Sequence, residues 1–197
     1  MFIELTEILR CPRDHEQSYM ICVPMEMNGR DVVRGGISCP VCQTDFPIID
    51  SVALFAPPGG GAGDSGTLTA EAAHAFSGID GPGGYVALLG SAARLAGELF
   101  ERMPGVQLIA VNPPPGIGPG PRLSILRVRE AIPLKRPSIR AAIVGADALD
   151  LSDEAASVVL PGLRVVVESE SATLPGGTEL ARGAGVSVFE SGRKQKA

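Results

Sequence analysis

The clearest structural pattern in the chain is residues 84–111, GYVALLGSAARLAGELFERMPGVQLIAV. An aliphatic run at Tyr85–Leu89 is closed by a glycine, and Ser91 can cap a helix that a Pro-Gly pair at 104–105 stops. A second aliphatic run follows at Val106–Val111. Strands that are apolar throughout, rather than alternating, are typical of parallel sheets with both faces covered. The stretch therefore predicts a strand–helix–strand unit of an α/β fold.

The same alternation continues toward the C-terminus. Ser152 can cap a further helix through Leu160, which a Pro-Gly pair ends. Four more aliphatic runs are predicted strands: Leu123–Val128, Ile139–Val144, Leu163–Val167 and Val186–Phe189. The predicted fold class is α/β, with a Rossmann-like, mostly parallel sheet and flanking helices, preceded by a small β module.

Composition excludes several classes of protein. The chain has 197 residues, of which 45% are hydrophobic and 20% charged, so a folded core is expected. With 25 Gly and 17 Pro, long helical bundles are excluded. The net charge of −5 and the absence of Trp argue against nucleic-acid binding. There is no apolar run long enough for membrane insertion, and acids stand where a signal peptide would be basic, so a cytoplasmic protein is expected.

The chain divides by composition into two modules. Residues 1–56 hold all four cysteines, and residues 57–66, PPGGGAGDSG, read as a Gly/Pro linker. Residues 67–192 form the predicted α/β domain, and 193–197 are a predicted flexible tail. An Asn-Gly turn at 28–29 predicts a hairpin within the first module.

Cysteine spacing predicts a metal site in the first module. Cys39-Pro-Val-Cys42 supplies one pair of ligands at the spacing that structural zinc prefers. The other turn is Cys11-Pro-Arg-Asp14-His15, where either Asp14 or His15 completes the set. Zinc is the expected cofactor, and a fourth cysteine at position 22 is interpreted as a core residue. The alternative is a ribbon without metal, held together by its aliphatic residues.

The strings LTEILRCPRDH (5–15) and GGISCPVCQTDFPIIDSVALF (35–55) resemble the small zinc-ribbon family that includes the activator proteins of tRNA methyltransferases. The resemblance covers about residues 2–55 and departs at Asp14, and at Ser51-Val52 where that family usually has Gly-Ile. It implies a non-catalytic ribbon that pairs with a methyltransferase domain and keeps it folded. Such a domain could here be fused downstream.

Residues 67–192 resemble a class I S-adenosylmethionine-dependent methyltransferase in outline. The matching segments, in order, are Gly84–Gly90, Leu108–Asn112, Glu130–Leu134, Ser138–Gly145 and Val159–Glu168. The resemblance implies that the cofactor would be held by Gly90, Ser91 and Asn112.

Several residues that this resemblance requires are missing. Only one glycine, Gly90, stands where a Gly-rich loop is expected. Asn112 replaces the acid that would bind the ribose hydroxyls. The acid expected near the adenine is replaced by Arg129 or shifted to Glu130, and Arg140 stands where the acid of the fourth strand is expected. An arginine beside the cationic sulfonium would repel it. S-adenosylmethionine binding is therefore not expected, and no residue is assigned a catalytic role.

The leading hypothesis is a pseudoenzyme that acts as a scaffold, regulator or complex-assembly subunit with a protein partner. The aliphatic residues of the Phe46–Phe55 tail and the Val186–Phe189 strand are predicted to offer exposed edges for strand addition. The alternative is an active methyltransferase with divergent cofactor contacts. A third hypothesis is an anion or nucleotide binder that uses the basic residues between Arg122 and Arg140. These residues are expected around the carboxyl ends of the strands. The alternative interpretation of the same residues is scattered surface charge.

Overall fold

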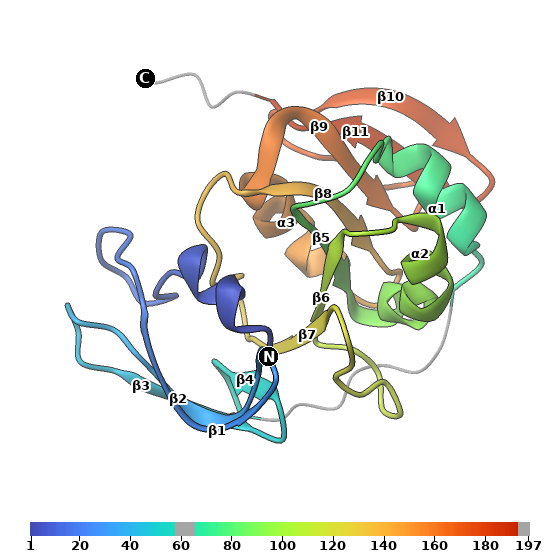
Figure 1. Ribbon diagram of the computed structural model, residues 1–197. Coiled ribbons are helices and arrows are strands. Elements are labelled where there is room, and N and C mark those ends of the chain that lie inside the picture. The colour runs from blue at the N-terminus through green and yellow to red at the C-terminus, as the bar shows by residue number, and fades with distance from the viewer. Residues whose placement is uncertain (58–65, 193–197) are drawn as a thin grey trace.

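A computed structural model describes residues 1–57 and 66–192. The predicted tail at 193–197, and all of the predicted linker except Pro57 and Gly66, lie outside the described residues. The described strands form one sheet in the order β1-β2-β3-β4-β7-β6-β5-β8-β9-β11-β10. Figure 1 shows the first four strands at the lower left and the helix-covered part of the sheet at the upper right.

The N-terminal elements are η1 (Ile3–Glu7), β1 (Ile21–Asn28), β2 (Asp31–Ser38), β3 (Asp45–Ile49) and β4 (Val52–Leu54). The central elements are α1 (Ala70–Ser77), β5 (Tyr85–Leu89), η2 (Gly90–Leu95), α2 (Ala96–Arg102), β6 (Gln107–Val111) and β7 (Leu123–Arg127). The C-terminal elements are β8 (Ile139–Val144), η3 (Leu149–Leu151), α3 (Ser152–Val158), β9 (Val159–Val167), β10 (Thr178–Gly183) and β11 (Val186–Glu190).

The middle of the sheet is parallel, from β4 through β7, β6, β5 and β8 to β9. Both ends of the sheet are antiparallel, with β1, β2, β3 and β4 at one end and β9, β11 and β10 at the other. The strand sequence β7-β6-β5-β8-β9 is the 3-2-1-4-5 order of a doubly wound sheet. The structure thus confirms a mixed α/β fold with a large sheet that contains parallel strands.

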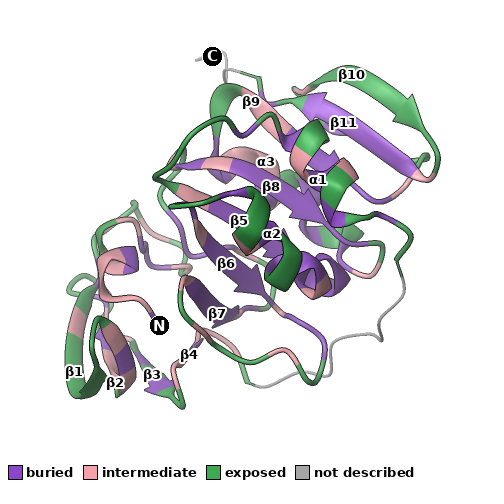
Figure 2. Ribbon diagram, turned by 45° about the vertical axis from the view of Figure 1, so that its right-hand side comes forward, coloured by how far each residue is buried: buried purple, intermediate pink, exposed green. Residues whose placement is uncertain are grey.

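The two faces of the sheet bury two separate apolar clusters, because successive side chains of a strand point to opposite faces. On β5, Val86 and Leu88 belong to the cluster beneath α1 and α2, whereas Ala87 and Leu89 belong to the cluster beneath α3. Figure 2 shows the central strands as almost entirely buried. The apolar strands predicted from the sequence are therefore buried on both faces.

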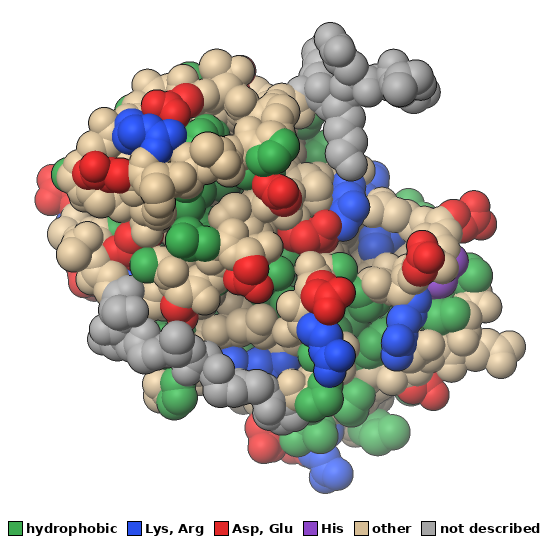
Figure 3. All heavy atoms as spheres, turned by 180° about the vertical axis from the view of Figure 1, so that it is seen from behind, with side chains coloured by type: hydrophobic (Ala, Val, Ile, Leu, Met, Phe, Trp, Pro, Cys, Tyr) green, Lys and Arg blue, Asp and Glu red, His purple; other side chains and the backbone are tan. Residues whose placement is uncertain are grey.

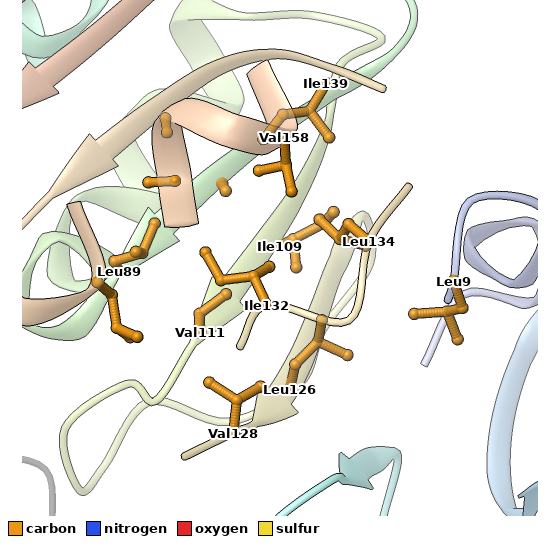
Figure 4. Packing of buried hydrophobic residues seen from close by; sticks show 14 of the residues in the cluster. Leu9, Leu89, Ile109, Val111, Leu126, Val128, Ile132, Leu134, Ile139 and Val158 are labelled. Carbon is orange, nitrogen blue, oxygen red and sulfur yellow. The ribbon is translucent and has the colours of Figure 1, made fainter. Parts of the chain in front are cut away.

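The N-terminal residues complete the core on the α3 face. Residues 128–138 between β7 and β8 contain two prolines and form no helix, so part of this face lacks a helical cover. Leu5 and Leu9, from η1 and the bridge that follows it, are fully buried in the same cluster as Ile132 and Leu134. Figure 4 shows Leu9 on the N-terminal segment, across from Leu134.

Backbone pairing joins the N-terminal strands to the rest of the sheet. β4 pairs in parallel with β7, with Val52 opposite Ile125 and Leu54 opposite Arg127. A second contact is the bridge between Leu9 and Leu134, in which the Arg10 N–H donates to the Pro133 carbonyl at 3.0 Å. We call this junction, formed by β4 with β7 and by residues 8–10 with 133–135, the seam.

The predicted hairpin around Asn28-Gly29 is confirmed, with Gly29 at a φ of 60°. The predicted exposed edges are wrong. The Phe46–Phe55 segment supplies β3 and β4, which are paired on both sides, and β11 lies between β9 and β10. The edges of the sheet are β1 and β10, and β10 was not predicted because its six residues are exposed and only weakly apolar.

Two predicted helices are shorter than expected. The helix that begins at Ser91 is a 3-10 segment followed by α2, and α3 ends at Val158 because β9 begins there. Among residues 1–57 and 66–192, none of the helices has the length and apolar character to cross a membrane.

Candidate functional site

Two turns of the N-terminal region bring four metal-ligating side chains together. Cys11 and His15 lie on the turn between η1 and β1, and Cys39 and Cys42 lie on the turn between β2 and β3. The second turn is closed by the Gln43 N–H, which donates to the Cys39 carbonyl at 2.9 Å. Gln43 has a φ of 56°, a left-handed conformation that turns the chain back toward β3. The ligand atoms of the four residues all lie within 4.8 Å of one another.

Two of the distances within the cluster match those around a tetrahedral zinc ion. Bond lengths of about 2.3 Å to sulfur and about 2.0 Å to nitrogen place two thiolates about 3.8 Å apart, and a thiolate about 3.5 Å from an imidazole nitrogen. The Sγ atoms of Cys11 and Cys42 are 3.7 Å apart, and Cys39 Sγ is 3.4 Å from His15 Nε2. Three sulfurs and one imidazole are a donor set that suits zinc rather than a hard cation.

The surroundings of the cluster orient its ligands. His15 Nδ1 lies 2.6 Å from the Glu16 carbonyl, so that this nitrogen carries the proton and Nε2 keeps a free lone pair. This carbonyl is the main reason that the pKa of His15 is raised. The Thr44 hydroxyl lies 3.2 Å from Cys42 Sγ, and hydrogen bonds from Thr44 lower the pKa of Cys42 to about 6. Burial raises the pKa of Cys11 to about 12, so its thiol needs a cation in order to ionise near neutral pH.

The structure selects among the predicted ligands by position. It brings His15 into the cluster, whereas Asp14 is exposed and is not among the four residues. Cys22 lies in β1, outside the cluster and packed against the hydrophobic core. Cys11, His15, Cys39 and Cys42 could therefore hold a metal ion.

A second candidate site is the group of loops at the carboxyl ends of β5, β6 and β8, the region where open α/β sheets bind ligands. We call this region the crevice after the position that it occupies in such sheets. Here the loop after β5 is in contact with the loop after β8. The Ser91 N–H donates to Asp147 Oδ1 at 2.7 Å. A Cβ atom on Gly90 would lie 2.4 Å from that oxygen, and one on Gly145 would lie 2.3 Å from Ser91 Oγ. The two loops pack directly on each other, and the Asp147 carboxylate accepts a hydrogen bond from the backbone at the start of η2.

Asn112 is also engaged by the protein itself. It follows β6 with a φ of 50°, a left-handed conformation that Asn tolerates better than most residues. Its Oδ1 accepts from the Val128 N–H at 2.9 Å, and its Nδ2 donates to the Val128 carbonyl at 3.1 Å. The side-chain amide thereby continues the ladder between β6 and β7. Its hydrogen-bonding groups are used within the fold.

One polar group in this crevice has no partner. The Ser91 hydroxyl is completely buried and makes no hydrogen bond in the part of the chain that the structure describes. Gly90, Ser91 and Asn112 therefore lie at the carboxyl ends of β5 and β6, as the sequence predicts, but each of the three is in close contact with another part of the chain, and only the Ser91 hydroxyl is left without a hydrogen bond.

The basic residues are divided between the two ends of the strands. Arg127 and Arg129 lie at the carboxyl end of β7, whereas Arg122 and Arg140 lie at the amino ends of β7 and β8. Arg140 lies at the amino end of β8, and its guanidinium donates to the carbonyls of Asp80, Gly81, Pro82 and Gly83. Arg122 precedes β7 and donates to the carbonyls of Phe100 and Met103. The expectation that Arg140 would repel a cofactor is wrong, because this residue organises a loop at the opposite end of the sheet.

A buried ion pair, which the sequence pattern did not predict, lies beside the crevice. Glu168, which is 5% exposed, accepts from the Arg94 guanidinium at 3.0 Å and from the Leu68 N–H at 2.7 Å. Arg94 lies in η2 and Glu168 follows β9, so the pair ties the loop after β5 to a strand two places away in the sheet. The acid at the end of an aliphatic strand was visible in the sequence, but its partner 74 positions away was not.

Comparisons with known proteins give distant similarity only. No protein-family model matches the chain, and no curated protein sequence matches it. Among solved structures, the complex between the Haloferax volcanii Trm112 methyltransferase activator and a methyltransferase is similar with a TM-score of 0.40 and 19% identity, over 50% of each chain. The antibiotic-resistance methyltransferase Kmr is similar with a TM-score of 0.44 and 13% identity, over 68% of this chain and 97% of its own. A geranyl diphosphate methyltransferase is similar with a TM-score of 0.40 and 17% identity, over 50% of this chain and 43% of its own. The chain thus spans half or less of the first structures that it matches.

Proposed function

We propose that this chain is a non-catalytic scaffold, in which a zinc-ribbon-like module at residues 1–56 is docked in cis on a degenerate methyltransferase-like domain at 67–192. The observation that carries the proposal is that the polar groups of the crevice are already hydrogen-bonded to other parts of the same chain. The Ser91 N–H binds the Asp147 carboxylate, and both hydrogen-bonding atoms of the Asn112 amide bind Val128. A cofactor would have to displace these contacts in order to reach the same groups.

The module at 1–56 supplies the structural part of this proposal. Its cluster of three cysteines and one histidine has the spacing of a zinc site, and we assign zinc to it. The ion would tie the turn that follows Leu9 to the turn between β2 and β3. Leu9 and β4 both form the seam, so that the ion would stabilise the module in its docked position.

A protein partner is supported by the exposed surface of β1. Its side chains at Ile21, Val23 and Met25 are 53%, 53% and 81% exposed, and β1 is an edge strand. Contiguous exposed apolar side chains are typical of interaction surfaces, and methionines adapt readily to a partner. We propose that the partner contacts this strand.

An active methyltransferase with divergent cofactor contacts is the second candidate. The buried Ser91 hydroxyl favours it, because a buried polar group without a partner is uncommon unless a ligand or water completes it. In this alternative, Gly90, Ser91 and Asn112 would hold S-adenosylmethionine after Asp147 had moved away.

Native mass spectrometry of the full chain, with and without S-adenosylmethionine, tests the proposal. We expect a mass increment for one zinc ion per chain and no cofactor adduct, while an established methyltransferase forms the adduct under the same conditions. A stable adduct would overturn the scaffold and support the alternative. A protein without zinc would overturn the metal assignment and leave a ribbon held by its apolar core.

A further inference from the structure

A cavity lies beside the seam, between residues of both parts of the chain. It has a volume of about 410 Å³ and lies where the parallel strands β4 and β7 end. Its walls come from the turn at 12–13, from β3, and from the segments 55–57 and 129–131. We call this cavity the seam cleft. Its volume falls in the range of small-molecule sites, and the carboxyl ends of parallel strands are where open α/β sheets bind their ligands.

Two arginines of the seam cleft have guanidinium groups without a protein partner. Arg13 and Arg129 are exposed, and neither guanidinium makes a hydrogen bond or an ion pair with the described residues, although the Arg13 carbonyl accepts from the His15 N–H. Other arginines of the seam are committed: Arg10 donates to the Glu7 and Leu9 carbonyls, and Arg127 to the Pro113 carbonyl. Arg13 comes from the N-terminal module and Arg129 from the loop after β7, so the docking of the two parts is what brings them to one cavity. Guanidinium groups pair bidentately with phosphate and carboxylate groups.

The rest of the lining adds an aromatic wall and a hydrogen-bond acceptor. The rings of Phe46 and Phe55 lie 4.8 Å apart at an angle of 39°. Glu130 is exposed on the same cleft, and an ionised carboxylate accepts hydrogen bonds but cannot donate them. A bare anion would meet this carboxylate unfavourably, whereas a ligand that also carries hydroxyl or amino groups would use it. Figure 3 shows basic side chains beside hydrophobic ones in the lower half of the face seen from behind.

We propose that the seam cleft binds a nucleoside phosphate. The phosphate pairs with Arg13 and Arg129, and Glu130 accepts hydrogen bonds from ribose hydroxyls. The planar base packs on the half-buried ring of Phe55, which Phe46, only 5% exposed, supports from within the core. All three chemical parts of the ligand have a complementary group in one cavity, and both parts of the chain contribute. This site lies outside the crevice of Ser91 and Asn112 and involves no catalysis, so it goes beyond the proposed scaffold function.

Isothermal titration calorimetry of the full chain with three probes tests the site: adenosine 5′-monophosphate, inorganic phosphate and adenosine. We expect saturable binding of one monophosphate per chain, and at least about tenfold weaker binding of the two partial probes, because hydrogen bonds to charged groups contribute strongly. Arg13→Gln and Arg129→Gln should each weaken binding of the monophosphate by about tenfold or more. Phe55→Leu should weaken it by about threefold or more through the loss of the ring.

Arg34→Gln is the matched control. Arg34 is an exposed arginine of β2 that does not line the cleft, so the variant should bind the monophosphate as the unchanged chain does. Loss of affinity in this control equal to that in Arg13→Gln would show unspecific charge attraction and overturn the site. Absence of saturable monophosphate binding at millimolar concentration would overturn it as well. Inorganic phosphate bound as tightly as the monophosphate would overturn the assignment of a nucleoside.

Discussion

The cluster of three cysteines and one histidine and the crevice after β5 are both formed by polar groups on neighbouring turns. In the cluster these groups face one another, whereas in the crevice they are hydrogen-bonded to the backbone. In the metal cluster, four ligand atoms within 4.8 Å face one another with no side chain of the protein between them. In the crevice, the Asp147 carboxylate and the Asn112 amide already bind the backbone of facing segments. The first arrangement could hold a metal ion, whereas the polar groups of the second already bind the protein itself.

The difference has a thermodynamic consequence. Thiolates held at contact distance repel one another unless a cation lies between them, so the cluster should gain stability when a metal ion binds. The hydrogen bonds of the crevice already contribute to the folded state, so a ligand that displaced them would have to offset their loss. Each of the following predictions tests one side of this contrast.

Removal of the metal should have the largest effect on stability. Chelation should lower the midpoint of thermal unfolding by on the order of 10 °C, which for a chain of this size corresponds to ~3 kcal/mol. The paired strands of the seam should keep the module docked, so that the loss is smaller than for an isolated zinc module. Calorimetry with and without chelator measures the shift, together with the zinc content of each sample.

Variants identify the residues that hold the ion. Cys39→Ser should lose the zinc, whereas Asp14→Ala and Cys22→Ser should keep one ion per chain, because neither residue belongs to the cluster. Loss of zinc from Asp14→Ala would show that the acid, and not His15, completes the site.

Asn112→Ala should destabilise the fold by about 2–3 kcal/mol. It removes two hydrogen bonds to Val128, at about 1 kcal/mol each, and places alanine at a φ of 50°, which costs about 1 kcal/mol more. Asn112→Gly loses the same hydrogen bonds without the conformational cost, so it should be the more stable of the two variants. Urea unfolding measures both, and an Asn112→Ala chain as stable as the unchanged one would contradict the structural role of this amide.

Asp147→Ala should have a smaller effect, about 1 kcal/mol, because it removes a single side-chain acceptor from the Ser91 N–H. Asp150→Ala is the control, since Asp150 is exposed and has no hydrogen bond in the described part of the chain. The same variant tests the crevice: if Asp147 alone excludes S-adenosylmethionine, the Asp147→Ala chain should bind it. Binding by this variant only would show that a cofactor site persists beneath the carboxylate.

The sequence predicted the strands of the fold well, because each central strand is a short apolar run bounded by turn residues. Tyr85–Leu89 and Ile139–Val144 are observed with the predicted bounds. It also predicted the metal cluster, since a Cys-Pro-Val-Cys turn determines much of its own geometry. It left open the choice between Asp14 and His15, because neighbouring residues of an irregular turn cannot be distinguished by spacing alone.

Long-range pairing could not be predicted in the same way. The parallel contact between β4 and β7 joins segments about 70 residues apart, and nothing in Val52–Leu54 specifies its partner. The predicted position of Arg140 was wrong for a related reason. The strand was predicted correctly, but a residue near its start lies at the amino end of the sheet, where the guanidinium finds backbone carbonyls rather than a ligand.

The last prediction concerns reactivity and involves no change in stability. Without metal, iodoacetamide should modify Cys42 first, because this thiol is exposed and has a pKa of about 6, so that it is mostly thiolate at pH 7. Cys11 should react slowly, because burial raises its pKa to about 12, and Cys39 is only 1% exposed. The rate at Cys42 should rise about tenfold between pH 5 and pH 7 as the thiolate forms, and level off above that. Peptide mapping by mass spectrometry follows each cysteine, and zinc should protect Cys42 in the loaded protein. Equal modification of Cys42 with and without zinc would mean that this thiol does not bind the ion. The cluster would then resemble the crevice, because its polar groups would not be available to a ligand.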